Sequence, residues 1–197
     1  MGKIKPIYII GDDGINDRQI ETVKETTKDI FDLIDVDEYP SVLIDKNGGG
    51  ILKMVGALIS EDGFAADVFG EQIDDLKLLE FFKTKLNNRY TVFLTRRYPN
   101  LNSKEHATAN FNNAGRALVG VGAIIRSRPY NEGGVCIDYR SLRIHTCHEL
   151  AHVFGLTYHC VNPNCTISKS YLLEHKDENM PYCDACLKNL KNCFRIK

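Results

Sequence analysis

The sequence predicts a single domain of mixed α/β (α+β) class, because predicted strands and helices follow one another along the chain. Short apolar runs bounded by turn residues, typical of strands, alternate with stretches whose apolar residues recur at the helical spacing. The chain has 197 residues, which is enough for one sizeable core. We therefore expect residues 1–197 to form one domain.

The first predicted elements are a strand, a capped helix and a second strand. Ile4 to Ile10 form an apolar run that ends at a turn cluster of Gly and Asp. Asn16 is a suitable N-cap for the helix that follows, because Gln19, three residues later, completes the pattern of a capping box. The second strand is expected from Tyr39 to Ile44. The helix has an apolar period made of Ile20, Val23, Thr27, Ile30, Phe31 and Ile34.

The middle of the chain continues this alternation after a glycine triplet at residues 48–50. The triplet lacks the Lys-Ser/Thr pair of a phosphate-binding loop, so we interpret it as a turn. Residues 51–59 fit either a strand or a buried helix, and Tyr90 to Thr95 fit a strand. The helix before that strand is marked by Ile73, Leu76, Leu79, Phe82 and Leu86.

A polar stretch and one further strand precede the C-terminal part of the chain. Arg96 to Gly115 is predicted to be a long surface loop, because it has no strong apolar period. Arg116 to Arg126 is predicted to be one strand, and the two glycines inside it allow close approach of another backbone. Arg126 and Arg128 could steer a substrate carboxylate, but exposed arginines are usually solvated, so we assign neither to the site.

The composition argues against a nucleic-acid or membrane partner. The chain has 25 Lys and Arg against 26 Asp and Glu, so no excess of positive charge points to a polyanion. The longest apolar runs are about ten residues, which is too short to cross a bilayer. Because the first residues carry no apolar signal-peptide region, we expect a cytoplasmic protein. By default we expect a monomer.

The segment from 138 to 154 is predicted to be the helix that carries the chemistry. His148 and His152 are four residues apart, so their side chains lie one turn apart on the same face and can reach one zinc ion. Gly155 follows, where a left-handed residue ends a helix with least strain and lets the chain double back. His159 can then supply a third nitrogen. Three protein ligands leave the fourth position open, as a catalytic zinc requires.

Glu149 lies beside the first of these ligands. A zinc ion lowers the pKa of water toward about 7, so a carboxylate here can act as general base and then pass the proton to a leaving amine. The alternative is that two histidines and a glutamate occur at this spacing by chance on a surface helix, because short motifs recur by accident. Gly155 and the nearby His159 favour the zinc site.

The seven cysteines, an odd count clustered near the C-terminus, argue against a disulfide framework. Two close pairs, Cys160 with Cys165 and Cys183 with Cys186, suit a closed four-cysteine structural zinc. Its binding energy would be local folding energy for a C-terminal segment with little apolar sequence of its own. Scattered free thiols, or a redox pair at Cys183, are the alternatives. Cys147 lies on the apolar stripe of the predicted helix and is expected in the core.

The joined string resembles the archaemetzincins, a metzincin-type family of zinc metallopeptidases that carry an additional four-cysteine zinc. It reads H-E-x-x-H-x-x-G from His148, then His159 and Cys160 side by side, a cysteine after four residues, and Cys-x-x-Cys ending at Cys186. The resemblance implies a zincin-like catalytic domain with a twisted mixed sheet. An upper part over about 1–155 would carry the active-site helix, and a small zinc-stapled part would follow over about 156–197.

The resemblance also implies roles for single residues. His148 and His152 correspond to the family's first two ligands of the catalytic zinc, and Glu149 corresponds to its general base. The strand at 116–126 would line the cleft and pair with an extended substrate. The family's structural-zinc ligands correspond to Cys160, Cys165, Cys183 and Cys186.

Two positions depart from the family pattern. The usual third histidine stands three residues after the glycine, but Tyr158 occupies that position and His159 comes one residue later. The His-Cys pair is intact, so the additional residue lies between Gly155 and His159. Ile167 stands where the family has a methionine beneath the ligands, and it can serve as a hydrophobic floor instead.

These features predict a zinc-dependent peptidase with two Zn²⁺ ions per chain, one catalytic and one structural, acting on peptides or protein segments. A non-catalytic two-zinc protein that fixes a fold or a binding surface is one alternative, and a zinc hydrolase of a non-peptide amide is another. Glu149 favours catalysis, because a purely structural site needs no carboxylate beside an open zinc. Tyr158 and Tyr171 are nearby candidates for stabilising an oxyanion.

Overall fold

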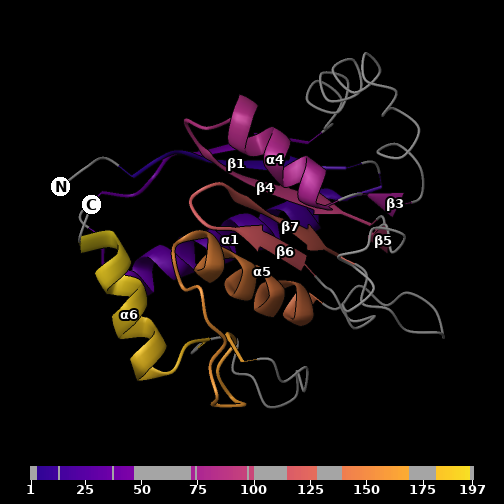
Figure 1. The fold of residues 1–197 in the computed structure, drawn as a ribbon. Coiled ribbons are helices and arrows are strands. Elements are labelled where there is room, and N and C mark those ends of the chain that lie inside the picture. Colours follow the sequence, from indigo (N-terminus) through magenta and orange to yellow (C-terminus); the bar gives the residue numbers. More distant parts are fainter. Residues whose placement is uncertain are drawn as a thin grey trace.

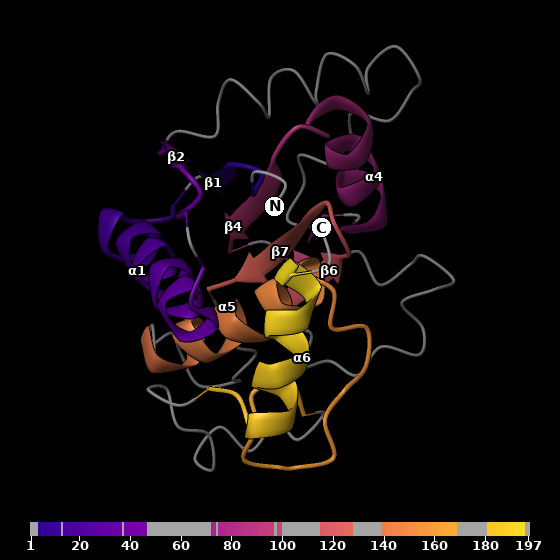
Figure 2. The same cartoon turned by 90° about the vertical axis from the view of Figure 1, so that its left-hand side faces the viewer.

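The computed structural model describes residues 4–12, 14–36, 38–46, 72–73, 75–96, 98–99, 115–127, 139–168 and 181–195. Within these ranges a five-stranded sheet lies between two layers of helices (Figure 1). Helices α1 (Asp17–Ile34) and α5 (Tyr139–Val153) cover one face, and α4 (Asp75–Lys85) covers the other. The turned view in Figure 2 shows α6 (Asp184–Arg195) on the same side of the sheet as α1 and α5. The predicted mixed α/β class is confirmed.

The sheet is mixed, with its strands in the order β2-β1-β4-β7-β6. Strands β2, β1, β4 and β7 run parallel to one another, whereas β6 runs antiparallel to β7 at one edge. Two short strands, β3 and β5, form a separate parallel pair. The bounds are β1 Ile7–Gly11, β2 Val42–Asp45, β3 Gln72–Ile73, β4 Tyr90–Thr95, β5 Tyr98–Pro99, β6 Gly115–Leu118 and β7 Gly122–Arg126.

Local sequence signals account for several elements. The backbone N–H of Gln19 donates to the Asn16 side chain at 2.9 Å, and the Asn16 N–H donates to the Gln19 side chain at 2.8 Å, which is the predicted capping box. Strand β4 has the predicted bounds and is buried along its whole length, as expected for a central parallel strand. The active-site helix spans 139–153 against a prediction of 138–154.

The predicted strand at 116–126 is wrong, because the structure divides it into the β6–β7 hairpin. Gly120 lies in the turn with a φ of +73°, a conformation that glycine adopts without strain. A Cβ on Gly122 would lie 2.1 Å from the carbonyl oxygen of Thr91, so only glycine lets β7 approach β4 here. The first glycine therefore turns the chain, and the second allows the expected close backbone contact.

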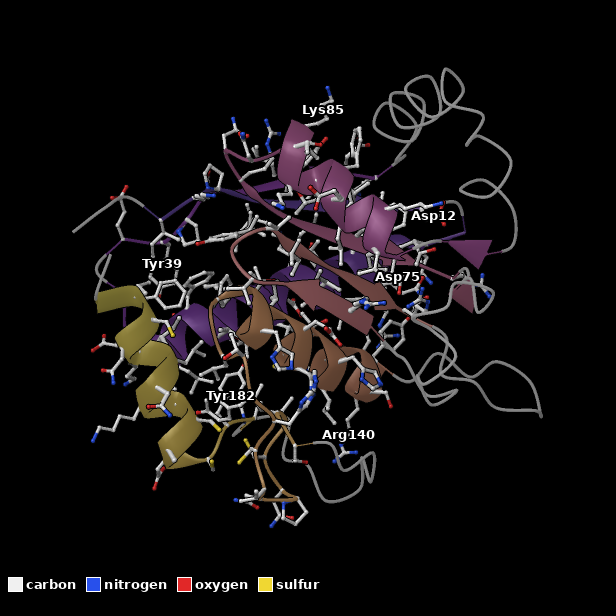
Figure 3. All side chains as sticks on the ribbon, viewed as in Figure 1. Asp12, Tyr39, Asp75, Lys85, Arg140 and Tyr182 are labelled. Carbon is white, nitrogen blue, oxygen red and sulfur yellow. The ribbon has the colours of Figure 1, made fainter. Side chains whose placement is uncertain are left out.

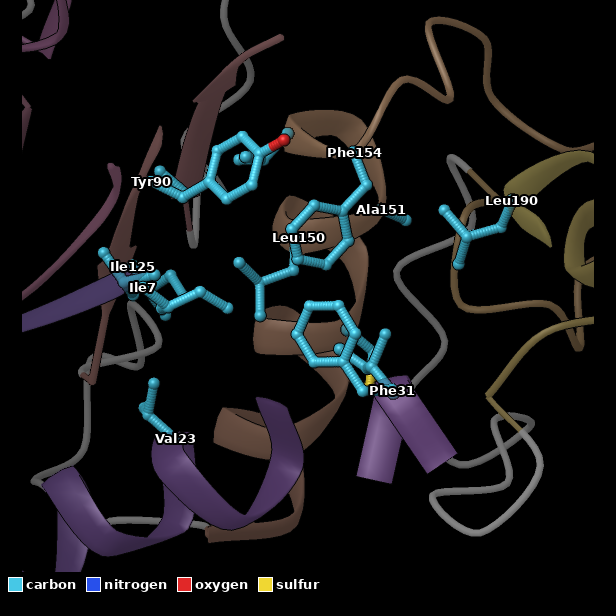
Figure 4. Packing of buried hydrophobic residues seen from close by; sticks show 14 of the residues in the cluster. Ile7, Val23, Phe31, Tyr90, Ile125, Leu150, Ala151, Phe154 and Leu190 are labelled. Atoms are coloured by element: carbon cyan, nitrogen blue, oxygen red, sulfur yellow. The ribbon is translucent and has the colours of Figure 1, made fainter. Parts of the chain in front are cut away.

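The main core joins the sheet to α1, α5 and α6 (Figure 4). Phe154, which follows the active-site helix, packs against rings from three other elements. Its ring centroid lies 5.3 Å from that of Phe31 on α1, 5.5 Å from that of Tyr90 on β4 and 5.2 Å from that of Phe194 on α6. Each such aromatic pair contributes about 0.5–1.5 kcal/mol beyond area burial. The C-terminal end of α5 is therefore fixed where the chain turns toward His159.

Helix α6 corrects the expectation that the C-terminal segment has little apolar sequence of its own. Leu190 is fully buried, and Leu187 and Phe194 pack against the same core. These residues recur at intervals of three and four, which places them on one helix face. Apolar packing therefore holds this segment in addition to its cysteines.

Some expectations fall outside the described residues. They include the glycine turn at 48–50, the strand or helix at 51–59 and most of the loop at 96–115, although Tyr98–Pro99 form β5 and Gly115 begins β6. Among the described helices, none combines the length and the apolarity that a bilayer crossing needs.

Candidate metal centres and active site

The three predicted histidines converge in space. The Nε2 atoms of His148 and His152, one turn apart on α5, lie 3.2 Å from each other. Two nitrogens bound tetrahedrally at about 2.1 Å from one zinc ion would be about 3.4 Å apart, so this spacing fits a shared ion. One ring nitrogen from each of His148, His152 and His159 falls within a group whose atoms lie within 4.8 Å of one another. The loop with one additional residue thus still brings His159 to the helix.

Backbone carbonyls orient the two helical histidines. The Nδ1 of His148 lies 2.7 Å from the carbonyl oxygen of Thr166, and the Nδ1 of His152 contacts the carbonyl oxygen of Leu156. Because a carbonyl only accepts, each Nδ1 carries the proton and each Nε2 is left with its lone pair toward the other histidines. Burial lowers the pKa of His148 to about 3, which keeps this imidazole neutral, the form that binds metal.

A Schellman motif ends α5 and starts the loop to His159. The N–H of Leu156 donates to the carbonyl of Ala151 at 3.0 Å, and the N–H of Gly155 donates to that of His152 at 3.1 Å. Gly155 has a φ of +121°, as predicted for a glycine after the last turn. A Cβ on Gly155 would also lie 3.0 Å from the Sγ of Cys193 on α6. The positive φ favours glycine here, and any larger residue would also require the Cys193 side chain to shift.

Glu149 is buried between α5 and the edge strand β6, with 8% of its surface exposed. Gly115 leaves room for it: a Cβ there would lie 2.6 Å from the Glu149 Cγ and 2.8 Å from Oε1. Burial, with the charge of Asp75 second, raises the pKa of Glu149 to about 8, although the charges of Arg126 and Arg116 act to lower it. Without a metal ion beside it, this carboxyl is held largely neutral near pH 7.

Arg126 corrects the expectation of a solvated arginine. It is 4% exposed and donates two hydrogen bonds to Asp75, at 3.1 and 2.6 Å. Asp75 is the first residue of α4, at the N-terminal end of that helix (Figure 3). The pair is a buried, bidentate ion pair close enough to influence the charge state of Glu149.

The four predicted cysteines form a second cluster. One sulfur from each lies within 4.8 Å of the others, and the Sγ atoms of Cys160 and Cys183 are 3.7 Å apart. Four thiolates around one zinc at about 2.3 Å would be about 3.8 Å apart, so the spacing fits a closed tetrahedral site. Burial raises the pKa of Cys165 and Cys186, so a cation is needed to hold all four as thiolates. Backbone N–H groups of Asn162 and Cys183 add hydrogen bonds to the sulfurs of Cys160 and Cys165, at 3.4 and 3.5 Å.

The two clusters are linked through the chain. His159 and Cys160 are adjacent, and Thr166, whose carbonyl meets His148, follows Cys165. The N–H of Cys160 donates to the carbonyl of Ile167 at 3.1 Å, which closes the loop between them. Ile167 is fully buried, consistent with its expected place as an apolar floor.

The remaining sequence candidates are Cys147, Tyr158 and Tyr171. Cys147 is in the core, as expected, and burial raises its pKa to about 12. The Tyr158 hydroxyl accepts a hydrogen bond of 2.7 Å from Asn189 on α6, which directs it toward that helix. Tyr171 lies outside the described residues. Sequence patterns gave no signal for Gly115 or Asp75 as neighbours of Glu149.

Comparisons with known proteins identify the fold. By sequence, the chain matches no family in a scan of protein families and no curated protein. By structure, it is similar to the crystal structure of archaemetzincin from Methanopyrus kandleri, with a TM-score of 0.63 and 18% identity. The match covers 98% of this chain and 96% of that one. The arrangement of strands and helices is therefore that of archaemetzincin. The donor sets of the two ligand clusters suit zinc.

Proposed function

We propose that this protein, which has the archaemetzincin fold, is a zinc-dependent peptidase that hydrolyses peptide bonds with Glu149 as general base. One zinc would be held by His148, His152 and His159, and a structural zinc by the four clustered cysteines. The observation that carries this proposal is the contrast between the two clusters. Four thiols close one of them, whereas among the described residues the other gathers three imidazoles, next in sequence to the buried carboxyl of Glu149, which leaves a fourth coordination position free.

Zinc, Glu149 and two backbone carbonyls would have separate roles in the proposed reaction. Zinc in the histidine cluster would supply Lewis acidity, which polarises a carbonyl and makes water acidic enough to lose a proton near neutral pH. Glu149 would accept that proton and later donate it to the leaving amine. Its burial against Gly115 holds the carboxylate in one place, so no reorganisation is needed when the proton moves. The Thr166 and Leu156 carbonyls keep both helical imidazoles in the ligand tautomer.

Strand β6 supports a peptide rather than a small amide as substrate. Among the described strands it pairs only with β7, so its other edge offers backbone groups to an extended segment. The hairpin is tied to the active-site helix by the N–H of Gly120, which donates to the carbonyl of Val153 at 2.8 Å. A segment added to β6 would therefore run past Glu149 at a fixed distance.

Two functions other than a peptidase would use the same ligand clusters. A non-catalytic two-zinc protein would use the same ligands but would not need a buried carboxyl beside the open cluster. A zinc hydrolase of non-peptide amides would use the same histidines and Glu149 but would not need the edge of β6. A cytoplasmic location and a monomeric state also stay predictions.

The proposal is tested by incubating a peptide library with the zinc-loaded protein and identifying new termini by mass spectrometry. We expect cleavage that stops when zinc is removed and returns when it is added back. Metal analysis should give two zinc ions per chain, with one lost in His152→Ala and one in Cys186→Ser. Two bound zinc ions without any new peptide terminus would contradict the peptidase and favour the structural alternative.

A further inference from the structure

A cavity of about 320 Å³ lies between α4 and β6. It is separate from both ligand clusters, because α4 covers the face of the sheet opposite α5 (Figure 1). Its volume falls at the small end of the range for ligand sites in proteins. Its lining consists of Leu76, Lys77, Leu79, Glu80, Ala117 and Leu118.

The register of the hairpin relates this cavity to Glu149. Gly115 pairs with Ile125, which belongs to the core under α5, and its missing side chain leaves room for Glu149. Arg116 pairs with Ile124, which belongs to the smaller core under α4, and Leu118 packs on that smaller core. Strand β6 thus presents one face to the general base and the other to the cavity, as the twofold alternation of a strand requires.

A segment added to the edge of β6 would follow the same alternation. Residues opposite each other on paired strands point to the same face of a sheet. The substrate residue opposite Leu118 would therefore direct its side chain toward α4. Because Leu118 is three positions from Gly115, this side chain would lie about 10 Å along the strand from the one opposite Gly115.

We propose that the cavity between α4 and β6 binds an uncharged apolar side chain of the extended substrate, about three residues to the amino side of the cleaved bond. The amino side follows from antiparallel pairing, the more stable arrangement per residue. In that arrangement the segment opposite the C-terminal end of β6 precedes the segment opposite Gly115. The position relative to the bond rests on the proposed peptidase function, whereas the cavity and the edge of β6 that no described strand pairs with do not.

The lining selects the chemistry of the side chain. Leu76, Leu79 and Leu118 supply apolar walls, and Leu79 is almost fully buried. A charged side chain placed against these walls would lose hydration, which is costly. Lys77 and Glu80 are exposed and carry opposite charges, so they add no net charge to the entrance.

The test measures binding of peptides to zinc-loaded Glu149→Gln, so that turnover does not consume them. The peptides differ only at the position opposite Leu118, which carries Leu, Phe, Ser or Asp. We expect Leu and Phe to bind about tenfold more tightly than Asp. Leu76→Lys should reverse this order in favour of Asp, and Leu76→Trp, which fills the cavity, should remove the preference for Phe.

Thr84→Lys is the matched control, because it adds the same charge to an exposed position of α4 outside the cavity lining. It should leave the order of affinities unchanged. An absent apolar preference, or an order that Leu76→Lys and Leu76→Trp do not alter, would overturn the cavity assignment. The same four side chains placed three residues to the carboxyl side of the cleaved bond should show no such order, and a preference that appears only there would overturn the antiparallel arrangement.

Cleavage of the same peptides by the wild-type protein separates this inference from the proposed function. Binding that follows the cavity variants, without cleavage by the wild type, would leave the cavity standing and refute the peptidase. Cleavage with no dependence on the side chain at this position would leave the peptidase standing and refute the cavity assignment.

Discussion

Replacing Gly115 by alanine tests how the structure positions Glu149. The added Cβ would lie 2.6 Å from the Glu149 Cγ, and ordinary contacts between such atoms begin at 3.4 Å. The Glu149 side chain must therefore retreat by about 0.8 Å, because Gly115 is fixed in β6 by its pairing with β7. A displacement of about 1 Å at reacting groups costs about a hundredfold in rate, or roughly 2.7 kcal/mol of transition-state stabilisation.

The assay is kcat/KM for a cleaved peptide, with zinc content and Tm measured on the same samples. Gly115→Ala should lower kcat/KM about a hundredfold while both zinc ions stay bound, and the crowding should cost about 1–3 kcal/mol of stability. Val119→Ala is the control, since it changes an exposed residue of the same hairpin, and it should leave kcat/KM unchanged. A Gly115→Ala protein with wild-type kcat/KM would refute the claim that this contact positions the base.

Three further predictions concern the frame around the site. Asp75→Leu should lower the free energy of unfolding by about 3–5 kcal/mol in urea titrations, because it removes the carboxylate that accepts both hydrogen bonds from the buried Arg126; a loss under 1 kcal/mol would show that the pair is hydrated. Phe154→Ala should cost about 3–5 kcal/mol and weaken zinc binding at the histidine cluster in chelator competition, whereas unchanged zinc affinity would show that the loop to His159 holds itself. Cys147, whose pKa burial raises to about 12, should resist iodoacetamide at pH 8 in the native protein, even after a chelator makes the clustered cysteines reactive. Mass spectrometry of labelled peptides would detect it, and early labelling of Cys147 would contradict its burial.

The sequence predicted those parts of the site that local chemistry determines. Histidines four residues apart on a helix share a face whatever the rest of the fold, and the structure brings their Nε2 atoms within 3.2 Å. The glycine that ends the helix was predictable from the same string, and it adopts a positive φ. The capping box at Asn16 and Gln19 was equally local.

The parts that the sequence did not predict depend on contacts between distant segments. Gly115 precedes Glu149 by more than thirty residues, and only the pairing of β6 with β7 brings its Cα against that side chain. From the sequence alone, Arg126 is expected in solvent at the end of a strand. Its partner Asp75 lies on α4, 51 positions away in the sequence. The hairpin at 115–126 was missed because two strands joined by a short glycine turn have the same apolar content as one long strand.

The most direct test of the account is kcat/KM for one cleaved peptide, compared between the wild type and Glu149→Gln at equal zinc occupancy. The account predicts a fall of about 10²–10⁴-fold in Glu149→Gln, because the amide retains the shape of the side chain but cannot accept the proton. Equal kcat/KM in the two proteins, with two zinc ions bound to each, would contradict it.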